Sequence, residues 1–72
     1  MQEVDARGLA CPLPLLKAKQ ALNQLASGEK LKVFATDEGS VRDFKTFAEL
    51  SGNILLESSQ DDAFYTYVIQ KV

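Results

Sequence analysis

The stretch GLACPLPLL, residues 8–16, holds the only cysteine of the chain, Cys11, and both of its prolines, Pro12 and Pro14. Proline is favoured at the first position of a helix, because its fixed φ suits a helix and its missing N–H would have no acceptor there. A second proline two residues later still lies in the first turn, whereas in mid-helix it would break the helix. The stretch therefore predicts a helix that begins at Pro12, with Cys11 at its N-cap.

The residues on either side of this stretch extend the prediction. Apolar residues recur at three- and four-residue spacing up to position 26, as expected for one face of a helix: Leu15, Ala18, Leu22 and Leu25. Gly28 is a typical C-terminal stop for a helix over residues 12–26. Before the stretch, residues 2–5 are predicted as a short edge strand, and Gly8 allows a sharp bend between strand and helix.

Three further strands are predicted downstream. Residues 30–36, KLKVFAT, alternate so that one face is apolar (Leu31, Val33 and Ala35), which is typical of a strand with one buried side. Residues 53–59 and 64–72 are predicted as two strands joined by a turn, with the acidic pair Asp61–Asp62 as a turn former and no metal site. The sequence does not decide which face of the last strand is buried.

A second helix is predicted over residues 41–51. Ser40 followed by Asp43 fits a capping box, and Gly52 fits a helix stop. Its apolar stripe is predicted as Val41, Phe44, Phe47 and Leu50. The element order is then βαβαββ, which predicts an α+β two-layer sandwich with both helices on one face of a four-stranded mixed sheet. The other face, with Phe34, is expected to be open to water or a partner.

Composition limits the possible functions. Without histidine, the chain lacks the usual partner of a catalytic cysteine and the commonest metal ligand, which excludes a Cys–His hydrolase and disfavours zinc. We expect no metal and no cofactor. A net charge of −2 gives no basic footprint for direct nucleic-acid binding. The absence of a membrane-length apolar run and of a signal peptide, with a single cysteine, predicts a cytoplasmic protein that does not bind membranes.

The predicted position of Cys11 has a chemical consequence. A helix N-terminus carries partial positive charge, which favours a thiolate and lowers the pKa of the thiol from its ordinary value of ~8.5. Arg7, Lys17 and Lys19 are near in sequence and would add positive potential. A lone cysteine is otherwise often a small buried hydrophobic residue. The residues alone leave both a reactive surface thiol and an inert packed thiol open.

Two segments resemble a known family. DARGLACPLPLLKAKQAL, residues 5–22, resembles the Cys-Pro-x-Pro signature of the TusA family of sulfur carrier proteins, also called SirA-like. TDEGSVRDFKTFAELSG, residues 36–52, resembles the second motif of that family, with matches at Thr36, Asp37, Gly39, Ser40, Asp43, Phe47 and Gly52. The last strand is also similar, so the resemblance covers essentially the whole chain. Departures, among them Glu38 for proline, Ala48 for a second cysteine and Asn53 for histidine, leave the subgroup open.

The resemblance implies a single sulfur carrier domain over residues 1–72, a stoichiometric carrier rather than a stand-alone enzyme. Cys11 would take sulfane sulfur as a persulfide from a cysteine desulfurase or rhodanese and pass it to an acceptor protein, as in the formation of 2-thiouridine in tRNA. We expect Asp5, Gly8, Pro12 and Pro14 to support the thiol. Arg7, Lys17 and Lys19 are hypothesised to form a docking patch on a monomer or weak dimer.

Two other functions remain open from the sequence. The first is a protein-interaction or regulatory module whose single thiol is inert or redox-sensing. It differs from a carrier because removal of the thiol would leave partner binding and cellular function unchanged. The second is nucleic-acid binding by analogy of fold, against which the net charge of −2 argues.

Overall fold

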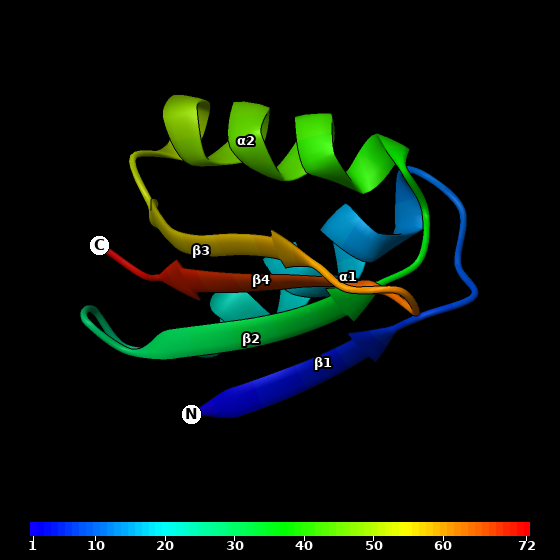
Figure 1. Cartoon of the computed structure of the whole chain (residues 1–72). Helices are drawn as coiled ribbons and strands as arrows, with labels where there is room; N and C mark the ends of the chain where they lie inside the picture. The colour runs from blue at the N-terminus through cyan, green and yellow to red at the C-terminus, as the bar shows by residue number, and fades with distance from the viewer.

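The chain forms two layers, a sheet and a pair of helices that cover one of its faces (Figure 1). The computed structural model describes residues 1–72, and six elements follow one another: β1 (Gln2–Ala6), α1 (Leu13–Leu22), β2 (Lys30–Ala35), α2 (Gly39–Ser51), β3 (Ile54–Gln60) and β4 (Tyr65–Gln70). The sheet order is β1-β2-β4-β3, with β1 parallel to β2 and the other two pairs antiparallel. The predicted two-layer βαβαββ fold is confirmed. Neither helix is long and apolar enough to cross a membrane.

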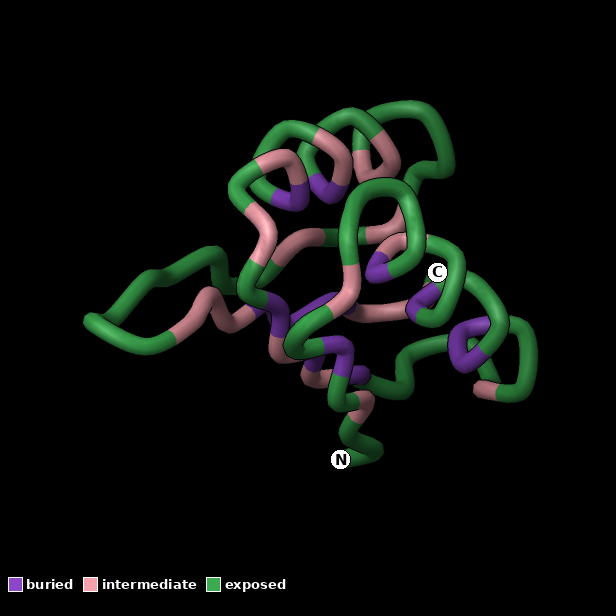
Figure 2. Tube along the Cα trace, turned by 90° about the vertical axis from the view of Figure 1, so that its right-hand side faces the viewer, coloured by how far each residue is buried: buried purple, intermediate pink, exposed green.

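The core lies between the sheet and the helices, where Figure 2 shows most of the buried residues. The alternation predicted for β2 is confirmed, since Leu31, Val33 and Ala35 are fully buried while Lys32 and Phe34 are half-buried. In β4 the buried face toward the helices carries Tyr67 and Ile69, which pair with β2. The ring of Tyr67 stacks on that of Phe44 from α2, with centroids 4.4 Å apart. This stack joins α2 to the sheet.

The first helix differs from its prediction at both ends. The N-cap is Pro12 rather than Cys11, because the N–H of Leu13 donates to Ala10 O at 2.9 Å and closes a turn over Cys11 and Pro12. The Cys11–Pro12 peptide bond is cis. The helix ends at Leu22 instead of continuing to position 26; the N–H of Leu25 donates to the carbonyl of Leu22 at 3.0 Å in a tighter turn, and the side-chain ammonium of Lys71 donates to the same carbonyl at 2.8 Å. A contact from the far end of the chain thus lies where the apolar spacing predicts further helix.

The second helix begins two residues before its prediction, at Gly39, and the expected capping box is absent. The hydroxyl of Ser40 donates to Asp37 O at 2.7 Å and is also hydrogen-bonded to the hydroxyl of Tyr67. The carboxylate of Asp43 contacts Cys11 instead of the helix backbone. The predicted stop at Gly52 is confirmed by its left-handed φ of 80°.

The predicted apolar stripe of α2 is only half buried. Phe44 is fully buried and Phe47 half-buried, but Val41 is 43% exposed and Leu50 is 84% exposed. With 3.6 residues per turn, each three-residue step rotates the side chain by about 60° around the helix. Four residues at this spacing therefore spread over half the circumference, and the ends of the set leave the core.

Candidate functional site

Cys11 is exposed in the loop between β1 and α1, and both helices begin beside it. The first residue of α1, Leu13, follows two positions later. The first residue of α2, Gly39, lies so close that a Cβ there would come within 3.3 Å of Cys11 Cβ and 3.6 Å of its Sγ. Glycine at this position therefore leaves room for the thiol between the two helix N-termini.

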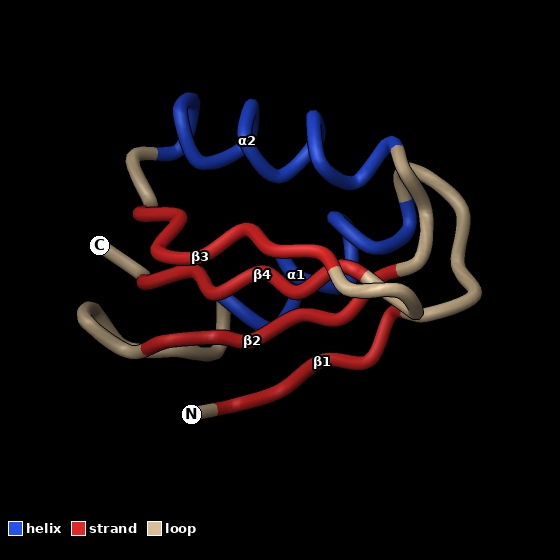
Figure 3. Tube along the Cα trace, in the orientation of Figure 1, coloured by secondary structure: helices blue, strands red, loops and turns tan.

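The two loops that form the site meet because β1 and β2 are parallel. Parallel strands end at the same edge of a sheet, so the loop after β1 and the loop after β2 lie together, as Figure 3 shows. The N–H of Gly8, which has a φ of 83°, donates to Thr36 Oγ1 at 2.8 Å and ties the loops to each other. The N–H of Gly39 donates to Asp37 Oδ2 at 3.0 Å and orders the second loop.

The nearest polar neighbour of the thiol is Asp43, from the second turn of α2. Cys11 Sγ donates to Asp43 Oδ2 at 2.6 Å. This hydrogen bond raises the pKa of the Cys11 thiol; burial and the charges of Asp43 and Asp37 add to the effect, while Arg42 opposes it. The lowered thiol pKa expected from the helix N-terminus is therefore wrong in direction, because a full negative charge in contact outweighs the partial positive charge of the helix end.

Asp5 and Arg7 form the one ion pair of the chain. The carboxylate of Asp5 accepts hydrogen bonds from Arg7 N, Nε and Nη2 at 3.1, 2.8 and 3.0 Å. The side-chain hydrogen bonds from Arg7 lower the pKa of Asp5 to about 2. The guanidinium also lies over the rings of Phe34 and Phe64, 5.9 and 5.2 Å from their centroids. Arg7 is thus held on the side of the sheet that the helices leave open.

The structure places the three hypothesised docking residues in different local surroundings. Lys19 Nζ lies 5.4 Å from the ring centroid of Phe47, between the two helices, whereas Arg7 lies over aromatic rings of the sheet. Lys17 is exposed and its charge adds to the lowering of the pKa of Asp5. Of the two prolines, Pro14 is buried within the first turn of α1 and supports the helix start.

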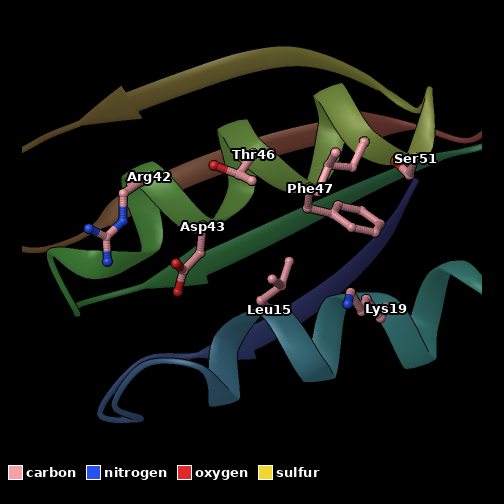
Figure 4. Close-up of a pocket in the computed structure, with 8 residues that line it drawn as sticks. Leu15, Lys19, Arg42, Asp43, Thr46, Phe47 and Ser51 are labelled. Carbon is pink, nitrogen blue, oxygen red and sulfur yellow. The ribbon is translucent and has the colours of Figure 1, made fainter.

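A groove of about 400 Å³ runs between α1 and α2 (Figure 4). Asp43 lines the groove and contacts Cys11, so the two features are continuous. The side chains of Leu15 and Phe47 make its walls apolar, and Lys19 and Arg42 supply positive charge. The other lining residues are Thr46, Leu50 and Ser51. Nowhere in the chain do three or more metal-ligating side chains come together.

Sequence reasoning missed the part that Asp43 plays at the site. The spacing of Ser40 and Asp43 predicts a capping box, although Asp43 also matches the second motif of the resembled family. That motif contains Asp43, which accepts the hydrogen bond from Cys11, and Gly39, where a Cβ would lie 3.3 Å from Cys11 Cβ. The presence of both residues in the motif was the sequence signal that they lie near Cys11.

Comparison with known proteins gives a consistent result. The family model described as sulfurtransferase TusA matches residues 2–71. The sulfur carrier protein TusA of Allochromatium vinosum is 51% identical over 97% of this chain and 92% of its own length. A putative sulfur carrier protein of Bacillus subtilis is 41% identical over 94% of this chain and 91% of its own length.

A solved structure is also similar throughout. The crystal structure of the SirA-like protein from Desulfitobacterium hafniense superimposes with a TM-score of 0.85 and 29% sequence identity. The match covers 97% of this chain and 96% of that one. The whole βαβαββ arrangement is therefore shared.

Proposed function

Because this chain belongs to the TusA family of sulfurtransferases, we propose that Cys11 accepts sulfane sulfur as a persulfide and that the protein relays it to an acceptor protein. Relatives named as sulfur carrier proteins support the carrier role. The observation that carries the persulfide proposal is an exposed thiol at the junction of two helix N-termini, at the mouth of a groove.

The chemistry needs no group beyond the thiol itself. The thiolate of Cys11 attacks the outer sulfur of the donor persulfide; the new Sγ–S bond forms as the donor S–S bond breaks, and the donor thiolate leaves with the electron pair. The sulfur moves at its own oxidation level, so no oxidant is required. With one cysteine in the chain, no second thiol attacks the loaded persulfide to form an internal disulfide.

The proposed partners are two proteins. The donor is of the cysteine desulfurase or rhodanese type, and the acceptor belongs to a pathway such as formation of 2-thiouridine in tRNA. We propose that residues 1–72 act as one carrier domain, in the cytoplasm, as a monomer or weak dimer. The interhelical groove, with Lys19 and Arg42 at its sides, supports docking of a larger protein next to Cys11.

Intact mass spectrometry without reductant tests the proposal. The protein is incubated with cysteine and a cysteine desulfurase, or with thiosulfate and a rhodanese, beside a Cys11→Ser control. We expect a gain of one sulfur atom that a thiol reductant removes and that the control lacks. Sulfur retained by the serine variant, or no gain with either donor, rejects the carrier function and leaves the interaction module.

A further inference from the structure

The hydrogen bond between Cys11 and Asp43 opposes the ionisation that sulfur transfer requires. A thiolate is the attacking species in exchange at sulfur. Loss of the proton from Sγ would leave a thiolate 2.6 Å from a carboxylate oxygen. Like charges at this distance strongly disfavour the second ionisation. The free protein therefore holds its thiol in the protonated, less reactive form.

No cation of the chain forms an ion pair with Asp43; Lys19, which lines the same groove, has its ammonium 5.4 Å from the ring centroid of Phe47. The single ion pair joins Arg7 to Asp5, at the other side of the sheet. Arg42 is the adjacent residue, and side chains one position apart on a helix do not face each other. Figure 4 shows the carboxylate of Asp43 directed toward α1 and the guanidinium of Arg42 lying apart from it. The first turn of α1, residues 13–16, has no charged side chain.

The carboxylate is nevertheless accessible from outside. Asp43 is half-buried and lines the mouth of the groove between α1 and α2. A cationic side chain entering this groove would reach the carboxylate directly next to Sγ. A partner protein could therefore reach the Asp43 carboxylate, which has no ion pair, and change the protonation of the Cys11 thiol that it contacts.

We propose that Asp43 is a positioning residue that keeps the Cys11 thiol protonated in the free carrier and releases it when a cationic side chain of the docked sulfur donor pairs with the carboxylate. This inference rests on the proposed carrier function. The cation pairs with the Asp43 carboxylate, so that the carboxylate no longer accepts the hydrogen bond from Cys11 and its negative charge is offset. The thiolate of Cys11 then forms in the complex. The thiol proton leaves to water as the thiolate forms, and the donor thiolate departs afterwards with the electron pair of the broken S–S bond. The free carrier is thereby protected from stray alkylation and oxidation, which select thiolates.

The other charges around the thiol are less suited to this control. Asp37 is already engaged by the N–H of Gly39 at 3.0 Å, and Arg42 favours the thiolate without contacting it. Asp43 is the charged group in direct contact with Sγ. Removal of its charge should consequently move the titration of the thiol more than any other single substitution.

The first experiment needs no sulfur donor. The rate of alkylation by iodoacetamide is measured against pH for the wild type, Asp43→Asn and a control, Glu38→Gln, which removes a charge near the start of α2 without contacting the thiol. We expect the titration midpoint of Asp43→Asn to lie about one pH unit below that of the wild type, which is a roughly tenfold gain in thiolate at pH values below the midpoint. The midpoint of Glu38→Gln should equal that of the wild type. A midpoint shared by Asp43→Asn and the wild type overturns the proposal. Circular dichroism verifies folding, and Asp43→Ser provides a second variant.

The second experiment measures sulfur loading against donor concentration. Asp43→Asn should raise the half-saturating donor concentration several-fold, because the donor cation loses its partner, while the maximal loading rate does not fall. A fall in the maximal rate with unchanged half-saturation overturns the proposal, since Asp43 would then act in the transfer step. If no variant takes sulfur, the carrier function fails, and the alkylation profile still decides what Asp43 does to the thiol.

Discussion

The hydroxyl of Ser40 lies 2.7 Å from the hydroxyl of Tyr67, joining the first turn of α2 to β4 within the protein interior. Ser40 is 1% exposed and Tyr67 is fully buried. Ser40 stands next to Gly39, where an added Cβ would lie 3.3 Å from Cys11 Cβ. This buried pair therefore fixes the start of α2 against the sheet at the point where it meets the thiol.

Loss of the two hydroxyls should have unequal effects. Ser40→Ala leaves the buried hydroxyl of Tyr67 without its partner, and we expect a loss of about 1–3 kcal/mol in the free energy of unfolding. Tyr67→Phe leaves Ser40 with its hydrogen bond to Asp37 O, so we expect about 0.5–1.5 kcal/mol. Urea unfolding of the two variants measures both values. An equal or reversed order would contradict this assignment.

The double variant provides the control for this pair. Removal of both hydroxyls leaves no unpaired group on either side, so the loss should be smaller than the sum of the single losses. Contacting residues typically couple by about 0.5–3 kcal/mol in such cycles. Strict additivity would mean that the two side chains do not interact in solution.

Asp37 should stabilise the start of α2 through its side chain. Its Oδ2 accepts the N–H of Gly39 at 3.0 Å, which satisfies one of the unpaired donors of the helix N-terminus. Asp37→Ala should cost about 0.5–2 kcal/mol, as for loss of a helix cap, while Asp37→Asn keeps an acceptor oxygen and should cost less. Thermal unfolding followed by circular dichroism distinguishes the two. If both variants lost the same stability, charge rather than hydrogen bonding would be responsible.

Local patterns account for the part of the fold that the sequence predicted. The alternation in residues 30–36, the prolines beside Cys11 and the glycine at position 52 each act over a few neighbouring residues, and each led to the correct element. The helix ends were less predictable. At the end of α1 the carbonyl of Leu22 accepts a hydrogen bond from Lys71, which lies 49 positions away in the sequence.

The central contact of the site was beyond local reasoning. Cys11 and Asp43 are 32 positions apart, and they meet only because the parallel pairing of β1 and β2 brings two loops to one edge. The Ser-x-x-Asp pattern predicts a helix cap from local spacing alone. It carries no information that the aspartate contacts a residue of another element instead of the helix backbone. The expected direction of the thiol pKa failed for the same reason, since it considered one helix end and omitted a carboxylate from another element.

The two ends of the predicted α2 stripe should respond differently to truncation. Phe44 is fully buried and stacks on Tyr67, so Phe44→Ala should cost about 3–5 kcal/mol, a large part of the stability of a small domain. Leu50 is 84% exposed, so Leu50→Ala should change stability by less than about 0.5 kcal/mol. Urea unfolding checks both. A large loss for Leu50→Ala would show that this side chain is covered in solution.

The ion pair between Asp5 and Arg7 should make stability depend on acid pH. The hydrogen bonds from Arg7 lower the pKa of Asp5 from 3.8 to about 2. A carboxyl whose pKa is lowered by folding stabilises the protein above its unfolded value, and this contribution is lost as pH falls through the folded value. We therefore expect Asp5→Asn to have a lower Tm than the wild type at neutral pH, with a difference that shrinks between pH 3.8 and about 2.

Asp62→Asn, which removes an exposed carboxylate without an ion pair, is the matched control. A Tm difference that stays constant down to about pH 2 would mean that Asp5 acts through the shape of its side chain, because a charge-dependent contribution disappears when the carboxyl is protonated.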